Sequence, residues 1–250
     1  ISMFSVIFPG QGSQSVGMAK ELYDNFTYVK DFFNEADDTL GYSISKIILE
    51  GPKEHLDLTE NTQPAIFLLG YSIFQLIKKE FKIDLNKANF FAGHSLGEYT
   101  ALASAEVLDF SDTLKILKIR GRAMQEAVPK GEGGMVAVLG SEIAKIEKII
   151  KTNSYECYIA NDNSIGQLVV SGNNKEIEKF ILSLKNENIK NVKLTVSAPF
   201  HCKLMKKATD VMINEIEKLK FNKPKNLLVS NVTAEEIQDT SAIKELLIKQ

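Results

Sequence analysis

The sequence has no tryptophan, and it has only two cysteines and three histidines among its 250 residues. The cysteines, Cys157 and Cys202, form no Cys-x-x-Cys pair, so we expect no disulfide framework. The histidines are scattered along the chain, which argues against zinc, and we expect no bound metal. The net charge is −2 and the pI is near 6.0, so nothing in the charge balance favours nucleic acid as a partner.

Long apolar runs are also missing. No stretch approaches the about 20 consecutive apolar residues that a membrane span needs, and the N-terminus lacks the pattern of a secretory signal. We therefore expect a cytoplasmic protein that does not enter a membrane. The hydrophobic share of 44% and the charged share of 25% are typical of a globular chain, long enough for a main domain that carries a smaller one.

Hydrophobic periodicity predicts alternating strands and helices in the first half of the chain. Short apolar runs at 4–8 and 89–92 read as buried strands. Helical patterns occupy 18–39, 64–80, a segment that ends near 105, and 112–127. Thr62 is a candidate cap for the second of these helices, with Pro64 in its first turn. The alternation predicts an α/β fold.

The pattern changes after residue 129. A glycine-rich stretch at 131–134 indicates a linker, and elements then follow in the order β-α-β-β-α-β, which is typical of a ferredoxin-like unit. Helix and strand patterns return near 202–219 and 226–230. We therefore predict a discontinuous core of residues 3–128 and 197–250, interrupted by an α+β insertion at 129–196.

The segment Gly93-His94-Ser95-Leu96-Gly97 matches the pattern G-x-S-x-G between a strand and a helix. In that context a sharp turn presents the serine hydroxyl, and the flanking glycines permit the close packing. The N–H of Leu96 would then point to where an oxyanion forms. This pattern predicts Ser95 as a nucleophile, although a serine that merely caps a helix after a tight turn would look similar.

A serine hydroxyl needs a base to remove its proton. His94 is adjacent to Ser95, but neighbouring side chains diverge on a tight turn, and His55 lies in a polar stretch typical of a surface. His201 follows a strand, at the kind of position where α/β sheets build sites, and it is our candidate base.

Three aspartates lie between the serine and this histidine. Asp109 and Asp112 stand at a helix start, where capping explains them. Asp162 follows a strand and could complete a triad, but we favour a polar loop there. A serine–histidine dyad, with main-chain oxygens orienting the imidazole, is the better interpretation.

Arg120 falls on the apolar face of the helix predicted at 112–127. An inward charge is costly unless it is paired. Its guanidinium could reach water past its own stem, or it could bind a carboxylate in a bidentate fork. The residues alone leave both interpretations open.

A glycine-rich loop, residues 10–15, follows the first strand. It lacks the third glycine of a dinucleotide fingerprint and the lysine of a phosphate-binding loop. Its backbone, or Gln11, could supply a second oxyanion donor. On spacing alone, a turn that merely tolerates glycine is the simpler interpretation.

Taken together, the whole chain resembles the malonyl-CoA:acyl carrier protein transacylases of bacterial fatty acid synthesis. The resemblance rests on six motifs in order: FPGQGSQ (8–14), TQPA (62–65), GHSLGEY (93–99), RGRAMQ (120–125), GQLVVSG (166–172) and PFH (199–201). It implies a hydrolase-like α/β core with a parallel sheet plus an inserted ferredoxin-like subdomain. It also implies malonyl-CoA and acyl carrier protein as partners, a monomer, and no cofactor other than the coenzyme A thioester used as substrate.

The resemblance also implies roles for single residues. Ser95 would carry the acyl group, His201 would be its base, and Arg120 would hold the malonyl carboxylate. Gln11 and the Leu96 N–H would form the oxyanion hole.

Further positions line the implied pocket. Gln63 and His94 would contact the substrate, and Phe200 matches malonyl-selective acyltransferases. Gln250 falls where a main-chain oxygen of the family supports the histidine.

Two departures from the family stand out. Glu106 occupies a position where the family usually has glycine. The family also continues for some fifty residues beyond the position of Gln250, with a late Gly-Pro-Gly segment, so either the chain is truncated or the sequence is only part of a longer one. Two alternative functions remain open: a serine thioesterase or esterase, which shares the nucleophile turn, and a non-catalytic acyl-binding scaffold.

Overall fold

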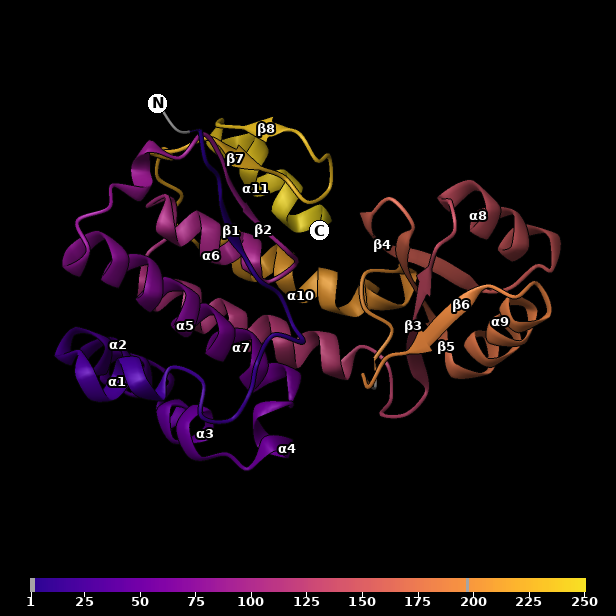
Figure 1. Ribbon diagram of the computed structural model, residues 1–250, viewed down its shortest axis with the longest axis horizontal. Helices are drawn as coiled ribbons and strands as arrows, with labels where there is room; N and C mark the ends of the chain where they lie inside the picture. Colours follow the sequence, from indigo (N-terminus) through magenta and orange to yellow (C-terminus); the bar gives the residue numbers. More distant parts are fainter. Residues whose placement is uncertain (1–2, 197) are drawn as a thin grey trace. The chain divides into compact units, whose positions relative to one another are not determined.

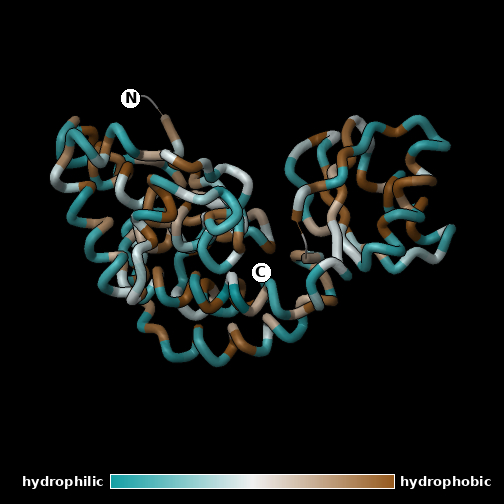
Figure 2. The backbone as a smooth tube through the Cα atoms, turned by 90° about the horizontal axis from the view of Figure 1, so that it is seen from below, coloured by the Kyte–Doolittle hydropathy of each residue, from teal (hydrophilic) through white to brown (hydrophobic). Residues whose placement is uncertain are grey.

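A computed structural model describes residues 3–196 and 198–250. The chain divides into two compact units. Figure 1 labels the helices and strands of both. The larger unit comprises Ile1–Arg122 and Met212–Gln250, and the smaller unit comprises Ala123–Val211. Brown, hydrophobic segments lie inside each unit in Figure 2, so each has a core of its own.

The larger unit is built around a four-stranded sheet in the order β1-β2-β7-β8. The first three strands are parallel and β8 is antiparallel to β7. The strands are β1 (Val6–Phe8), β2 (Phe91–Gly93), β7 (Leu228–Val229) and β8 (Glu236–Ile237). Its helices are α1 (Lys20–Asn25), α2 (Thr27–Leu40), α3 (Ile44–Glu50), α4 (Lys53–Leu56), α5 (Thr59–Glu80), α6 (Gly97–Ser104), most of α7 (Phe110–Glu126), the last residues of α10 (Lys206–Glu217), and α11 (Thr240–Lys249), with a 3-10 turn at Leu85–Lys87.

Helices α5 and α6 bury the most of their surface in this unit. Every residue of α6 is buried, and α5 is buried along most of its first half. Phe91 of the central strand β2 is fully buried and packs edge-on against Phe8 of β1 and Phe74 of α5. This aromatic cluster joins sheet and helix directly below the turn that follows β2.

The smaller unit carries the predicted β-α-β-β-α-β order, which is confirmed. Its elements are β3 (Gly133–Leu139), α8 (Ile143–Thr152), β4 (Cys157–Ser164), β5 (Gln167–Asn173), α9 (Asn174–Asn186) and β6 (Lys190–Lys193), followed by a 3-10 turn at Lys203–Met205. The strands form an antiparallel sheet in the order β4-β5-β3-β6. Apolar residues of α8 and α9 form its core with the sheet, so the expected α/β core with a ferredoxin-like insertion describes the fold.

The boundaries of the smaller unit are wider than the predicted 129–196, because they fall inside α7 and α10. A separate apolar cluster explains the difference. It joins the end of α7 and the start of α10 to β3 and β5 through Met124, Ala127, Met135, Val169, Ala198, Phe200, Met205 and Ala208. Residues 198–211, predicted to lie in the core domain, therefore belong to the smaller unit.

Several local expectations need correction. The helix predicted at 18–39 is two helices, because Phe26 adopts an extended conformation between α1 and α2. Thr62 is not a cap, since α5 already begins at Thr59, and its hydroxyl donates to the carbonyl of Leu58 at 3.0 Å. The sequence patterns do not predict the short helices α3 and α4, the helix α11 or the short strand β8.

Glu106, the departure from the family's glycine, lies just beyond the end of α6 with φ +62°. A left-handed conformation after a helix favours glycine, which explains the family's preference. The Glu106 carboxylate forms an exposed ion pair with Lys225. The left-handed backbone at Glu106 is therefore strained, and its side chain lies at the surface.

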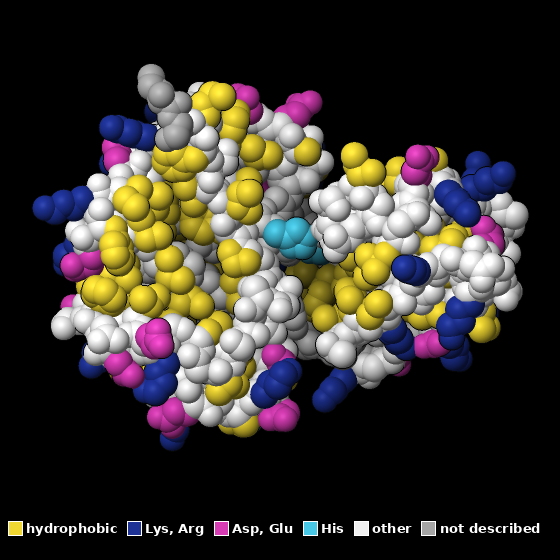
Figure 3. Space-filling view, in the orientation of Figure 1, with side chains coloured by type: hydrophobic (Ala, Val, Ile, Leu, Met, Phe, Trp, Pro, Cys, Tyr) yellow, Lys and Arg dark blue, Asp and Glu magenta, His cyan; other side chains and the backbone are white. Residues whose placement is uncertain are grey.

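Strand β1 lies at the edge of the larger unit's sheet. Ile7 of this strand is 74% exposed, and a hollow of about 310 Å³ beside it is lined mainly by apolar residues of β1 and α5. Figure 3 shows apolar side chains gathered on the visible face of this unit. The unit thus presents an edge strand and an apolar hollow together.

We expect Phe91→Ala to destabilise the larger unit by roughly 3–5 kcal/mol, because it leaves a cavity between sheet and helix. Urea unfolding of the full chain measures this change. Phe81→Ala is the matched control: its ring is 60% exposed, so its effect should stay within about 0.5 kcal/mol. Equal effects of the two substitutions would contradict this description of the core.

Candidate active site

The G-x-S-x-G segment forms the predicted strand–turn–helix. Strand β2 ends at Gly93, α6 begins at Gly97, and Ser95 between them has φ +55°. A Cβ on Gly93 would lie 1.9 Å from the carbonyl carbon of Gly97, and one on Gly97 would lie 2.4 Å from the carbonyl oxygen of Phe8. Both glycines are therefore required by backbone packing, and the strained turn lifts the serine out of the sheet.

The N–H of Leu96 lies at the start of α6, which is fully helical from Gly97. Within residues 3–196 and 198–250, no acceptor is bonded to this N–H. The first N–H groups of a helix lack intrahelical partners and carry partial positive charge. The group therefore has the properties of an oxyanion donor, and this role stays a prediction.

The glycine-rich loop packs directly against the nucleophile turn. A Cβ on Gly10 would lie 2.5 Å from the carbonyl oxygen of His94 and 2.9 Å from its ring nitrogen Nδ1. Glycine is therefore needed at position 10, and the interpretation of a loop that merely tolerates glycine is wrong there. The same contact places the exposed His94 side chain over this loop.

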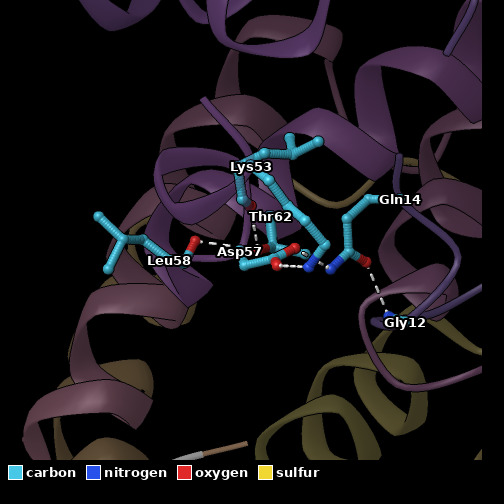
Figure 4. A network of polar contacts seen from close by, with 7 residues as sticks. Gly12, Gln14, Lys53, Asp57, Leu58 and Thr62 are labelled. Atoms are coloured by element: carbon cyan, nitrogen blue, oxygen red, sulfur yellow. Dashed lines mark hydrogen bonds and ion pairs between the residues drawn. The ribbon is translucent and has the colours of Figure 1, made fainter. Parts of the chain in front are cut away.

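Polar side chains tie this loop to α4 and α5. Gln14 accepts a hydrogen bond from the N–H of Gly12 at 2.8 Å and donates to Asp57 at 2.9 Å, as Figure 4 shows. Asp57 also pairs with Lys53. Gln11 donates to the hydroxyl of Thr59 at 3.3 Å. The loop that carries the predicted second oxyanion donor is thus held at several points.

Arg120 of α7 is 4% exposed. The interpretation that its guanidinium reaches water past its own stem is therefore wrong. Nη1 donates to Oε1 of Gln63 at 2.8 Å. Nη2 donates to Oε1 of Gln250 at 2.7 Å and to Oγ of Ser95 at 3.3 Å. The guanidinium also lies over the ring of Tyr99, 5.4 Å from its centre.

The partners of Arg120 are neutral. Among the residues that the structure describes, no carboxylate forms an ion pair with it. Burial lowers the pKa of Arg120, while the nearby Tyr99 and Glu98 oppose that shift. A guanidinium held by amides beside a serine hydroxyl keeps its charge available for an anion, and its planar fork can pair with a carboxylate through two parallel hydrogen bonds.

Sequence reasoning missed Glu98, which is 6% exposed at the start of α6. Its Oε2 accepts hydrogen bonds from Nε2 of Gln250 at 2.7 Å and from the N–H of Asn231 at 3.4 Å. Burial raises the pKa of Glu98 to about 7, although these hydrogen bonds and Arg120 partly counteract it. The available signal was a charged residue in a helix that carries no other charge.

Gln250 connects these groups through its side chain. Besides accepting from Arg120, its Nε2 donates to the main-chain oxygen of Ser95 at 2.9 Å and approaches Oδ1 of Asn231 at 3.0 Å. The structure therefore brings together Ser95, Arg120, Gln63 and Gln250, all within the larger unit. The expected support of the histidine by the main chain of Gln250 stays a prediction.

His201 and Phe200 belong to the smaller unit. Phe200 is 6% exposed and packs in the apolar cluster with Met124 and Met205, so its role in the substrate pocket stays a prediction. His201 is half-buried with φ +53°. Because Ser95 lies in the other unit, the assignment of His201 as the base also stays a prediction.

The aspartates have simple explanations. Asp109 accepts a hydrogen bond from the N–H of Asp112 at 3.2 Å, which confirms capping at the start of α7. Asp162 does not lie in a loop as expected; it lies in β4, opposite Leu168 of β5.

Comparison with known proteins decides the family. The family model of the acyl transferase domain matches residues 5–246. The malonyl CoA-acyl carrier protein transacylase of Salmonella typhimurium is 37% identical over 253 residues, which cover 100% of this chain and 81% of that protein. The Bacillus subtilis transacylase is 38% identical over 254 residues, covering 100% and 79%. The chain belongs to the malonyl CoA-acyl carrier protein transacylase family.

Solved structures of transacylases agree. The acyl-carrier-protein S-malonyltransferase of Bartonella henselae superposes with a TM-score of 0.94 at 39% identity, over 99% of this chain and 80% of that one. A malonyl-transacylase solved in complex with a type II polyketide acyl-carrier protein gives 0.94 at 36% identity, over 99% and 80%. The fold expected of a transacylase is confirmed.

Two further features were sought in the described residues: membrane-spanning helices and metal-binding clusters. None of the helices in the described ranges has the length and apolar character to cross a bilayer. Over the same residues, no three His, Cys, Asp or Glu side chains gather in a way that could hold a metal ion.

The raised pKa of Glu98 predicts a pH effect on stability. Between pH 4.5 and about 7 the folded state keeps a proton that the unfolded state has lost, so Glu98 lowers stability as pH rises through this window. We expect Glu98→Gln to gain stability relative to the unsubstituted chain over that window, by up to roughly 3 kcal/mol. Urea unfolding below and above the window measures the difference, and a pH-independent difference would contradict the assignment.

Proposed function

We propose that the chain transfers a malonyl group from malonyl-CoA to the phosphopantetheine thiol of an acyl carrier protein, for fatty acid synthesis, through a malonyl ester on Ser95. The carrying observation is the buried Arg120, whose Nη2 lies 3.3 Å from Oγ of Ser95 and whose partners are neutral amides. Relatives whose names state this reaction support the substrate pair. A cytoplasmic location and a monomeric state stay predictions.

In the first half-reaction Oγ of Ser95 attacks the thioester carbonyl, and His201 takes the hydroxyl proton. The carbonyl oxygen becomes an oxyanion, stabilised by the Leu96 N–H and by the loop of Gln11. When the tetrahedral intermediate collapses, the carbon–sulfur bond breaks and coenzyme A leaves as the thiol with the proton from His201. The malonyl group is now an ester of Ser95.

The second half-reaction repeats these steps with the carrier's thiol as nucleophile. His201 accepts the thiol proton, sulfur attacks the ester, and the proton returns to Oγ of Ser95. Two displacements of this kind predict ping-pong kinetics. Arg120 holds the malonyl carboxylate through both, which selects a dicarboxylic acyl group and orients it.

Three lysines that follow His201 are a candidate docking patch for the acidic carrier: Lys203, Lys206 and Lys207. Lys203 lies 5.8 Å from the ring centre of Tyr158, and Lys206 pairs with Asp210 at 3.1 Å. The alternative explanation for these lysines is an exposed helix face. The related malonyl-transacylase solved with its carrier protein favours a carrier as the acceptor.

Two rival functions are compatible with the site around Ser95. A thioesterase would use water in place of the thiol, and an acyl-binding scaffold would leave the serine unmodified. The buried guanidinium disfavours a general esterase, because it matches an anionic acyl group rather than an apolar one.

We expect the chain to gain one malonyl group when mixed with malonyl-CoA and acetyl-CoA without carrier, and Ser95→Ala to gain none. Intact-protein mass spectrometry measures both. In the same experiment His201→Ala should acylate far more slowly, whereas His55→Ala, at an exposed position of α4, should not. Rapid release of malonate without an adduct would favour the thioesterase, and an unmodified, inactive chain would favour the scaffold.

We expect Arg120→Ala to lose its preference for malonyl-CoA over acetyl-CoA, because the malonyl carboxylate then has no charged partner. The loss should correspond to roughly 2–5 kcal/mol, with acetyl transfer partly kept. Competition between the two thioesters, read as kcat/KM ratios, measures the preference. Arg122→Ala is the matched control, since Arg122 lies two residues away and is exposed. Unchanged selectivity in Arg120→Ala would rule out the clamp.

A further inference from the structure

Asn231 follows the short strand β7 and contacts the nucleophile turn from 136 positions away in the sequence. Its Oδ1 accepts a hydrogen bond from the N–H of Ser95 at 2.8 Å, and its Nδ2 donates to the carbonyl of Gly93. No sequence motif pointed to this residue, and the reaction proposed above gives it no role.

The register of the sheet explains this contact. Phe91 pairs with Leu228 and Ala92 with Val229, and the N–H of Phe91 donates to the carbonyl of Leu227. In a parallel ladder that continued in this register, the carbonyl of Gly93 and the N–H of Ser95 would bond to the main chain of residue 231. The side chain of Asn231 supplies both bonds instead.

The main chain of Asn231 does not continue the strand, so it does not form these two bonds. Strand β7 ends at Val229, and Ser230 closes a tight turn in which it accepts from the N–H of Ala234 at 2.8 Å. The N–H of Asn231 points to Oε2 of Glu98 at 3.4 Å. A primary amide carries a donor and an acceptor in fixed geometry, so asparagine can replace a peptide group here.

We infer that Asn231 is a positioning residue for Ser95: its side-chain amide extends the sheet by one further rung and holds the nucleophile turn in its left-handed conformation. This inference rests on the proposed function of Ser95. On the opposite side, the N–H of His94 donates to the carbonyl of Phe8 in β1 at 3.0 Å. The turn is therefore held from both neighbouring strands, although β7 itself has ended.

The consequence concerns the acylation step rather than substrate binding. Ser95 has φ +55°, a strained conformation for a non-glycine residue that persists only where its surroundings impose it. Without Asn231 the turn can relax, which moves Oγ and the Leu96 N–H together. The Arg120 site should persist, because Nε2 of Gln250 keeps the carboxylate of Glu98 and the main-chain oxygen of Ser95 as acceptors.

The test compares Asn231→Ala with Val232→Ala, a neighbouring substitution at an exposed side chain. Rapid-quench mass spectrometry gives the rate of Ser95 acylation and the apparent Kd for malonyl-CoA. We expect Asn231→Ala to acylate roughly tenfold to a hundredfold more slowly, since displacement of a nucleophile by about 1 Å has effects of that size. The Kd should stay within about twofold, and Val232→Ala should match the unsubstituted chain.

Hydrogen exchange of peptides covering residues 93–98 provides a readout that needs no activity. The Ser95 amide should exchange faster in Asn231→Ala and unchanged in Val232→Ala, because only the former loses the acceptor. Unchanged exchange at this segment, an unchanged acylation rate, or a Kd weakened in proportion to the rate would overturn the inference. Absence of a malonyl adduct in the unsubstituted chain would instead refute the proposed function, and the exchange comparison would still decide the role of Asn231.

Discussion

The rest of the site depends on one constraint: backbone segments pack so closely that only glycine fits between them. Gly93 and Gly97 leave no room for a Cβ on either side of the nucleophile turn, and Gly10 leaves none between that turn and the N-terminal loop. The backbones of three chain segments are therefore in direct contact. This brings Ser95, the Leu96 N–H and the loop of Gln11 to one end of the parallel sheet, where strand ends leave peptide groups available.

A buried charge among neutral partners is the second organising feature. Arg120 is held by the amides of Gln63 and Gln250, and the nearby carboxyl of Glu98 is itself destabilised as an anion by burial. Neutral partners hold the guanidinium in place without neutralising it, whereas a direct carboxylate would compete with an anionic substrate. The same amide of Gln250 contacts the main chain of Ser95, so the acyl-binding group and the nucleophile share one support.

Local patterns predicted what local physics controls. The strand–turn–helix around Ser95 and the β-α-β-β-α-β unit follow from periodicity and glycine placement, as does the inward face of α7 that carries Arg120. Short elements such as α3, α4 and β8 escaped because a few residues carry too little periodicity. The boundary of the smaller unit was misplaced because the cluster around Phe200 joins segments that are distant in the chain.

The sequence by itself determined the fold class, the family and the candidate nucleophile, because these depend on residues close together in the chain or on motifs in a recognisable order. Only the tertiary structure decided that Arg120 is buried on amides, that Glu98 belongs to the site, and that Asn231 completes the sheet beneath Ser95. Each of these depends on a contact between segments far apart in the chain. A buried polar side chain must find a hydrogen-bond partner inside the protein, and the hydrophobic periodicity of the sequence does not indicate which residue that partner is.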